Sequence, residues 1–404
     1  MTLSRFIPLT SDAPGKAVAL RTNRAVGSFF CICLFLPLAL AFSACNSNPG
    51  PPAGLTVVKT TDLGPIVTNP DILGRDGAYS ALFQGYSVWL YGDTFLANPN
   101  AEGFGLISDT WSYTTDLNAQ DGITGFQERL DSAGAPTMIL QLTANELAFN
   151  LAHNGNPCQE QPCGARWALW PSSIVTDPSS NQALVFYMLV SAQPGNFNFQ
   201  AVGNSIALWQ NFQQLPQRPT FNPPIVVGHP DLMFNENEPD FGTAALINSG
   251  TLYVYGCGTP ANGADKGCRL AKVDSASAQN RSAWTFYAGN GTWSPQLSDA
   301  ISVFNGSSIV SVSWNSFLLQ YVAVYSPPFS QNVMMRTAPS PEGPWSKEVL
   351  AFVAKQPVSG NVYDAHAHSE YDLNGGETIF VSYSRATGEF TSEVRLVSVQ
   401  LQRP

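Results

Sequence analysis

Short strand-like runs separated by turn residues recur along the chain after residue 55, and they limit the fold more than any other feature. Examples are Ala183–Val190, Thr251–Tyr255 and Thr378–Tyr383, which are rich in β-branched and aromatic residues. Turn residues such as Asn248-Ser249-Gly250 separate neighbouring runs. No long amphipathic helical pattern accompanies them. The sequence therefore predicts an all-β chain.

One arrangement recurs along these runs: a polar or aromatic cluster, a strand, a turn, and a second strand that ends in aromatic residues. The copies lie at Asp76–Phe95, Trp167–Val190, Glu238–Cys257, Val312–Tyr325 and His366–Tyr383. Five copies predict a five-bladed β-propeller, whose four-stranded sheets surround a central channel. A β-sandwich with long insertions is the competing architecture. If each cluster opens the innermost strand of its blade, all the clusters face one end of the channel.

The N-terminal region predicts export. Arg21 and Arg24 precede an apolar run over 26–42, and the segment ends in Phe42-Ser43-Ala44-Cys45. We expect residues 1–44 to be a lipoprotein-type signal peptide, residues 45–54 a Pro/Gly-rich tether, and residues 55–404 a single domain. The residues Phe42–Cys45 resemble a bacterial lipoprotein box. This resemblance implies that Cys45 carries lipid and anchors the protein in a bacterial cell envelope, at the outer membrane or cell surface. An ordinary signal peptide with a chance cysteine is the alternative.

The four cysteines after residue 54 agree with an exported protein. They form two close pairs, Cys158 with Cys163 and Cys257 with Cys268, among Pro, Gly, Asn and Gln residues. We predict two local disulfides, as found in oxidising compartments. Metal binding is the alternative, but neither pair has two histidines beside it.

The charge of the chain limits its partners. Only 12% of residues are charged, and the formal net charge is -10. An acidic chain is a poor partner for nucleic acid, whereas neutral polar side chains suit a polyhydroxylated ligand. We therefore expect a polysaccharide or other glycan as ligand. We also expect membrane contact through the lipid anchor only, and a monomer.

A pair of aspartates in one hairpin is the leading candidate for a catalytic site. The runs Ala78–Phe83 and Ser87–Tyr91 are joined by a turn at Gln84-Gly85, and Asp76 and Asp93 flank them. In an antiparallel hairpin these flanking positions lie at the same end. Hydrolysis of a glycosidic bond needs one carboxylic acid and one carboxylate. We predict Asp76 and Asp93 as this pair, although Asp before Gly is also common turn chemistry.

Further candidates lie in the other repeats. Glu238 is an alternate catalytic acid, and Trp170 and Trp314 are candidate sugar platforms, although most propeller tryptophans pack between blades. The predicted substrate-binding residues are Arg75, Tyr79, Trp170, Asp240, Trp314, Asn315, His366 and His368. Strand alternation would place Asp364, His366 and His368 on one face. These histidines either bind a metal or only hydrogen-bond neighbouring carboxylates.

Several stretches together resemble the domain-of-unknown-function family 4185. They are Gly74–Ser80, Trp89–Thr94, Trp314–Asn315, Tyr321–Tyr325, Ala338–Trp345, His366–His368 and Val381–Ser384. The resemblance implies a five-bladed propeller related to furanosidases that cleave arabinan and fructan, and some relatives are endo-D-arabinanases. It also implies that Asp76 and Asp93 occupy acidic positions near the active centre, with a looser match at Glu238 and Asp240.

We predict no obligatory cofactor. Because propeller furanosidases often hold calcium in the channel, the resemblance permits a structural calcium near His366. The functional prediction is a secreted or surface-anchored glycoside hydrolase that acts on a furanosidic polysaccharide, with endo-D-arabinanase-like activity. The alternative is a non-catalytic glycan-binding propeller, in which the acids are structural.

Overall fold

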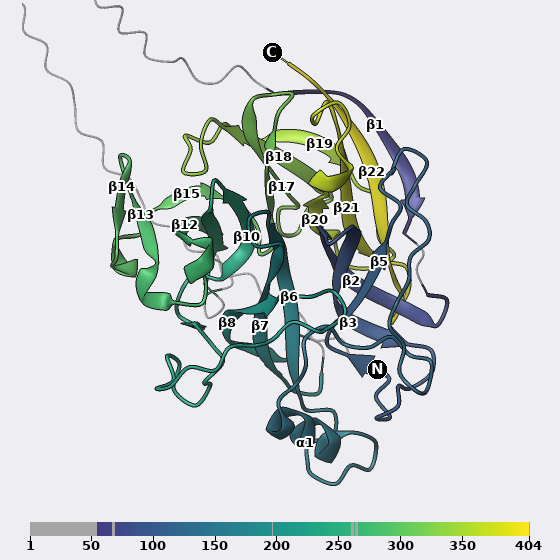
Figure 1. Cartoon of the computed structure of the whole chain (residues 1–404). Coiled ribbons are helices and arrows are strands. Elements are labelled where there is room, and N and C mark those ends of the chain that lie inside the picture. Colours follow the sequence, from purple (N-terminus) through teal and green to yellow (C-terminus); the bar gives the residue numbers. More distant parts are fainter. Residues whose placement is uncertain (1–54, 67–68, 196, 260–261, 263–265, 404) are drawn as a thin grey trace, which may run out of the picture. The chain divides into compact units, whose positions relative to one another are not determined.

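The described part of the chain is a ring of five β-sheets (Figure 1). The computed structural model describes residues 55–66, 69–195, 197–259, 262 and 266–403. The predicted signal peptide (1–44), the tether (45–54) and the lipidation site Cys45 lie outside these residues. The described residues all belong to one compact unit, Pro49–Pro404. The prediction of an all-β, five-bladed β-propeller is confirmed, and the sandwich alternative is wrong.

The first three blades follow the chain in order. Blade I contains β2 (Ile72–Phe83), β3 (Tyr86–Leu96), β4 (Leu106–Ile107) and β5 (Thr110–Thr114). Blade II contains β6 (Arg166–Asp177), β7 (Gln182–Ala192), β8 (Phe199–Trp209) and β9 (Phe234–Asn235). Blade III contains β10 (Phe241–Asn248), β11 (Thr251–Cys257), β12 (Gly267–Asp274), β13 (Thr285–Gly289), β14 (Thr292–Ser294) and β15 (Ser302–Asn305).

The last two blades complete the ring. Blade IV contains β16 (Ser311–Asn315), β17 (Gln320–Tyr325), β18 (Asn332–Ala338) and β19 (Val349–Val353). Blade V contains β20 (Tyr363–Ala367), β21 (Thr378–Ala386), β22 (Ser392–Gln402) and β1 (Thr56–Pro65). The antiparallel pairing of β1 with β22 joins the two ends of the described chain within one sheet. This pairing closes the ring and was not predicted from the sequence.

The innermost strands β2, β6, β10, β16 and β20 contact one another in that order, and β20 contacts β2. Each of them begins one of the five predicted repeats and pairs with the next strand of its own blade. In blade I, Gln84 and Gly85 both have positive φ values, 47° and 90°. Two such residues make the tight turn that suits twisted antiparallel strands. The predicted hairpin is therefore confirmed.

Hydrophobic clusters fill the interfaces between successive blades. Trp111 and Trp209 pack together between blades I and II, whereas Trp89 packs between blades V and I. Three further clusters fill the remaining interfaces. Because each sheet is covered on both faces, central strands such as β7 read as continuous apolar runs rather than as alternating ones.

The described chain also contains short helices. The sequence analysis missed α1 (Ala144–His153), which begins with a capping box between Thr143 and Glu146. Four 3-10 turns are η1 (Ser275–Ser277), η2 (Arg281–Ala283), η3 (Leu297–Asp299) and η4 (Ser369–Tyr371). Among the described residues, no helix has the length and apolarity needed to cross a membrane.

The predicted disulfides are both present. Cys158 is bonded to Cys163 in the loop after α1. Cys257 is bonded to Cys268, and the two residues are direct partners across β11 and β12. The metal-binding alternative for these cysteines is therefore wrong.

Candidate active site

Asp76 and Asp93 lie at the same end of the β2–β3 hairpin, as predicted. The register passes from Arg75 opposite Thr94 to Gly77 opposite Tyr91, so the irregularity leaves Asp76 facing the Gly92-Asp93 segment. A Cβ atom at Gly92 would lie 2.5 Å from Oδ1 of Asp76. The absence of a side chain at position 92 therefore makes room for the Asp76 carboxyl group.

Asp93 is held by two side chains of β6. Nη2 of Arg166 lies 2.7 Å from Oδ2 of Asp93, and Nε1 of Trp170 donates a hydrogen bond of 2.9 Å to Oδ1. Burial raises the pKa of Asp93, while Arg166 and Trp170 oppose the rise. Trp170 is thus brought to the predicted site, where it binds a carboxyl group through its indole N–H.

Asp364, on β20, joins this pair from blade V. Its Oδ2 accepts a 3.0 Å hydrogen bond from the Gly77 N–H, and the neighbouring Tyr363 hydroxyl donates to Oδ2 of Asp76 over 3.3 Å. Burial raises the pKa of Asp364 to about 7. Burial, then the charge of Asp364, then that of Asp93, raises the pKa of Asp76 well above its ordinary value. Burial and the two neighbouring carboxylates therefore favour the protonated form of Asp76.

Asp240 brings blade III into the same group. Burial raises the pKa of Asp240 to about 6, opposed by a 2.8 Å hydrogen bond from Asn204. The Tyr79 ring is 3% exposed. Burial raises the pKa of the Tyr79 hydroxyl, followed by the charges of Asp364, Asp76 and Asp240. The charges of Asp76, Asp240 and Asp364 thus act on the same hydroxyl group, and the charge of Asp93 acts on Asp76. We name these four aspartates the acid cluster.

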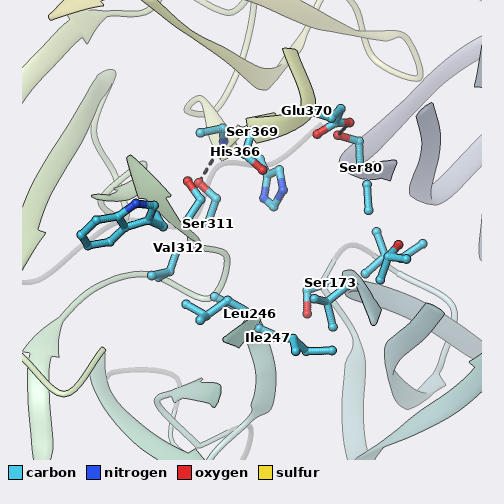
Figure 2. Close-up of a pocket in the computed structure, with 18 of the residues that line it drawn as sticks. Ser80, Ser173, Leu246, Ile247, Ser311, Val312, His366, Ser369 and Glu370 are labelled. Carbon is cyan, nitrogen blue, oxygen red and sulfur yellow. Dashed lines mark hydrogen bonds between the residues drawn. The ribbon is translucent and has the colours of Figure 1, made fainter. Parts of the chain in front are cut away.

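The acid cluster and a large cavity occupy different ends of the channel. The cavity, of about 720 Å³, is lined by the later residues of β2, β6, β10 and β20 and by β16 from Ser311 to Trp314 (Figure 2). Asp76 and Asp364 lie near the beginnings of β2 and β20. We call the end with the acid cluster the acid end and the end with the cavity the far end. A smaller cavity of about 180 Å³ reaches Arg166, beside Asp93.

The structure shows Arg75 in contacts within blade I, and its predicted substrate contact stays a prediction. Its side chain forms a buried ion pair of 2.8 Å with Glu128, and its guanidinium lies 3.5 Å from the centre of the Tyr91 ring. Neighbouring residues of a strand point to opposite faces, so sequence adjacency to Asp76 did not place Arg75 in the same site. Arg75 packs blade I instead.

Glu238 has a different environment from the acid cluster. Its Oε1 lies 3.0 Å from Nη2 of Arg281, and its Oε2 accepts a 2.9 Å hydrogen bond from the Asn235 N–H. Arg281 in turn lies over the Phe234 ring. These contacts give Glu238 a structural role in the turn before β10, whereas Asp240, two residues later, belongs to the acid cluster.

Trp314 and Asn315 lie at the far end, contrary to the prediction of a shared mouth. Trp314 is 47% exposed and lines the far-end cavity. Asn315 is buried, donates to the Gly376 carbonyl and accepts from the Leu318 N–H, both over 2.8 Å. The two residues end β16 rather than begin it, so the assumption that each polar cluster opens its inner strand fails in blade IV.

The two histidines of β20 and its C-terminal flank have separate surroundings. His368 is fully buried, stacks on Trp89 at 4.1 Å, and contacts the hydroxyls of Ser80 and Ser382 at 2.6 and 2.8 Å. It therefore packs the interface between blades I and V, and the predicted substrate contact of His368 stays a prediction. His366 lines the far-end cavity and meets the Tyr79 ring edge-on at 5.4 Å.

The side chains near His366 do not match the needs of calcium. Ca²⁺ takes six to eight oxygen ligands. His366 supplies only an imidazole, and the described residues contain no group of three His, Cys, Asp or Glu side chains arranged to hold a metal. These residues do not fit a calcium ion bound directly by the protein. The calcium near His366 stays a prediction.

The sequence analysis did not foresee several residues of the acid end. Arg166 and Tyr363 were not singled out, and Asp364 was noted only as part of an alternating strand. Asp364 has a positive φ of 56°, and the pairing of β20 with β21 is irregular between Tyr363 and His366. The expected alternation is therefore broken at this point. The acidic residue before the two histidines was the one available signal.

Comparison with known proteins places the chain in a family. Residues 53–385 match the model of DUF4185, which is described as a domain of unknown function. The chain belongs to this family. The resemblance inferred from the sequence is thereby confirmed. No curated protein matches the chain.

Solved structures share the fold at low sequence identity. A Bacteroides ovatus structure described as that of a candidate hydrolase has a TM-score of 0.52 and 14% identity, covering 80% of this chain and 85% of that one. The Podospora anserina α-L-arabinofuranosidase solved with cellotriose has a TM-score of 0.44 and 12% identity, with coverages of 86% and 98%. The Xanthomonas citri GH43_1 enzyme solved with xylotriose has values of 0.45, 11%, 83% and 90%. At these values only the first supports the fold, and none supports an activity.

Proposed function

We propose that the protein is a glycoside hydrolase and that the acid cluster is its active site. The observation that carries the proposal is the difference in surroundings between Asp76, which faces other carboxyl groups, and Asp93, which faces a cation. Burial and adjacent carboxylates raise the pKa of Asp76 strongly, whereas Asp93 has the cation of Arg166 at 2.7 Å. Paired acids with separated pKa values are the arrangement that glycosidic hydrolysis requires.

Each acid has a distinct role in the proposed reaction. Asp76 gives its proton to the glycosidic oxygen as the bond from that oxygen to the anomeric carbon breaks. Asp93 acts as the carboxylate, which either takes a proton from the attacking water or attacks the anomeric carbon itself. Tyr363 orients Asp76 through its hydroxyl, while Arg166 and Trp170 orient Asp93.

The proposed substrate is a furanosidic polysaccharide, cleaved with endo-D-arabinanase-like activity. Two features support this choice: the resemblance of Gly74–Ser80 and Trp89–Thr94 to the family in which such enzymes occur, and the low charge of the chain. The predicted exclusion of nucleic acid and the predicted monomer remain part of the proposal.

Product release from arabinogalactan tests the activity. We expect oligosaccharides from the wild-type protein and none from Asp76→Asn or Asp93→Asn, because each substitution removes one of the two required groups. Glu238→Gln is the matched control: it changes an acid that is bound to Arg281, and we expect it to retain turnover. If Glu238→Gln is inactive while Asp76→Asn is active, the assignment of the acids is wrong.

A non-catalytic glycan-binding propeller is the second candidate function. The observation in its favour is that Asp93 already bonds to both Arg166 and Trp170, as a structural carboxylate would. Under this alternative the wild-type protein binds arabinans or fructans but releases no product from any of them, and Asp76→Asn binds equally well.

We also propose that the protein works outside the cytosol, anchored through lipid on Cys45. The two disulfides support an oxidising compartment. Labelling of cells with a radioactive fatty acid tests the anchor. We expect label in the wild-type protein and none in Cys45→Ser; equal labelling of both would contradict the assignment.

A further inference from the structure

The far-end cavity has walls of two different kinds. Ser80, Glu370 and His366 stand on one side, while Leu246 and Val312 stand on the other side, and Ser173 lies beside Ile247 (Figure 2). Five inner strands and η4 contribute to these walls. The volume of about 720 Å³ lies within the range of roughly 300–1,000 Å³ that is usual for small-molecule sites.

Two buried polar atoms in this cavity lack a partner within the described residues. They are Oγ of Ser173, whose residue is 3% exposed, and Nδ1 of His366, whose residue is 8% exposed. Both residues line the cavity, and Figure 2 shows them on different walls of it. An unpaired buried polar atom costs stability unless water or a ligand supplies its partner. Both atoms are enclosed by protein, so a guest forms hydrogen bonds with them only after the side chains around them shift.

The charge of the cavity defines the class of guest. None of the described residues that line it is a lysine or arginine, and the one carboxyl group is that of Glu370. That carboxyl accepts hydrogen bonds from Ser80 and Ser87, and burial raises its pKa. Burial also lowers the pKa of His366 to about 4, so the imidazole is neutral at pH 7. An anionic guest would find no cation here.

The exposed indole of Trp314 supplies a flat apolar surface on the aliphatic side. Trp314 is 47% exposed, and its ring is supported edge-on by Tyr321 at 5.1 Å. A sugar ring has an apolar face that can lie on an aromatic ring and hydroxyl groups at its edge. We propose that the far-end cavity is a second binding site, separate from the acid cluster, for a neutral sugar residue or a short oligosaccharide.

The site is independent of the proposed hydrolysis. Ser80 lies four residues beyond Asp76 along β2 and lines the cavity, which Asp76 does not. Between the two ends, the Tyr79 and His366 rings meet edge-on. A protein that hydrolyses nothing can therefore still bind sugar at the far end, and binding rather than turnover is the proper measurement.

Isothermal titration of the full-length Asp76→Asn protein tests the proposal. The probes are free arabinose, a linear arabinofuranose tetrasaccharide, xylotriose and cellotriose. We expect at least one probe to bind at a site that Trp314→Ala weakens by about tenfold, because the stacking surface is lost. Ser173→Ala should weaken the same site by about fivefold, the equivalent of one hydrogen bond.

Matched variants separate binding from folding. Trp293→Ala, on β14 of blade III, removes a partly buried indole that does not line the cavity and should leave binding unchanged. Trp314→Phe should restore most of the affinity that Trp314→Ala loses. Tighter binding of the tetrasaccharide than of arabinose would identify a chain-binding site, and equal affinity would identify a site for single sugars.

The proposal is overturned if none of the four probes binds in a manner sensitive to Trp314 and Ser173. It is also overturned if Trp293→Ala weakens binding as much as Trp314→Ala does. If the wild-type protein hydrolyses none of the substrates, the proposed function is contradicted, but the binding result at the far end is unaffected.

Discussion

The acid end of the channel has four carboxyl groups from three blades, and the charges of Asp76, Asp240 and Asp364 act on Tyr79. The far end has one carboxyl group, and its walls are made mostly of aliphatic and hydroxyl side chains. All five inner strands line the far-end cavity, whereas the acids lie on β2, β3 and β20 and directly before β10. At the acid end the pKa values of Asp76, Asp240 and Asp364 all rise. Buried acids and a roomy cavity with one carboxyl group thus occupy different ends of the same channel.

The largest effect is expected from Arg166→Met, which removes the cation facing Asp93. Without Arg166 the pKa of Asp93 rises further, and Asp93 is a poorer carboxylate at neutral pH. We expect kcat to fall by about 10²- to 10⁴-fold, the usual contribution of such a group. Thermal unfolding should show a loss on the order of 3 kcal/mol, because a mostly buried carboxyl group loses its partner.

Arg336→Met serves as its control. Arg336 pairs with Glu348 over 3.0 Å, near the outer side of blade IV, and Glu348 is 40% exposed. We expect kcat to stay at the wild-type value. Equal losses of kcat in the two variants would mean that Arg166 acts only through stability.

A smaller effect is expected from Gly92→Ala. The added Cβ would approach Oδ1 of Asp76 to 2.5 Å, so the carboxyl group must move. A displacement of about 1 Å in a reacting group can cost about 10²-fold in rate, and we expect a loss of kcat/KM of that order. Gly105→Ala, where a Cβ meets nothing within 4 Å, is the control in the same blade. Unchanged kinetics in Gly92→Ala would show that the position of Asp76 is unimportant.

The smallest effect is expected from Asp364→Asn and concerns stability. The pKa of Asp364 is raised to about 7, so its contribution to stability is complete below about pH 4 and is lost as the pH rises toward 7. The amide keeps an oxygen for the Gly77 N–H but cannot ionise. We expect Tm at pH 8 to rise by about 2–4 °C over wild type, with a smaller difference at pH 4.

Melting curves of the two proteins across this pH range provide the measurement. His366 and Asp240 titrate in both proteins, so their contributions largely cancel in the comparison. A variant that is less stable than wild type at pH 8, or a difference that does not depend on pH, would contradict the raised pKa of Asp364.

The fold was predictable because its signals are local and repeated. Each first hairpin of a blade combines β-branched or aromatic runs with a turn, as in Gln84-Gly85, and needs no distant information. The closure of the ring was not predictable in this way. The pairing of Val57 with Leu401 joins the two ends of the described chain, and neither segment alone indicates its partner.

The site was predictable in part. Asp76 and Asp93 could be placed together because one hairpin carries both. Asp364 comes close to Asp76 from blade V because its φ is positive and the pairing of β20 with β21 is irregular at this point. Simple alternation of side chains along a strand does not predict this. Trp314 was assigned to the wrong end because its polar cluster closes β16 instead of opening it. The sequence therefore predicted which residues meet within one hairpin, but not which residues meet between blades.

The pH dependence of kcat/KM, measured for wild type and Asp364→Asn on arabinogalactan fragments, tests the central claim most directly. The claim is that Asp76 acts as an acid kept protonated by burial and by its carboxylate neighbours. Activity should fall on the alkaline side as Asp76 loses its proton. In Asp364→Asn this fall should move to lower pH, because removal of a neighbouring negative charge lowers the pKa of Asp76. An alkaline limb at the same pH in both proteins would contradict the account.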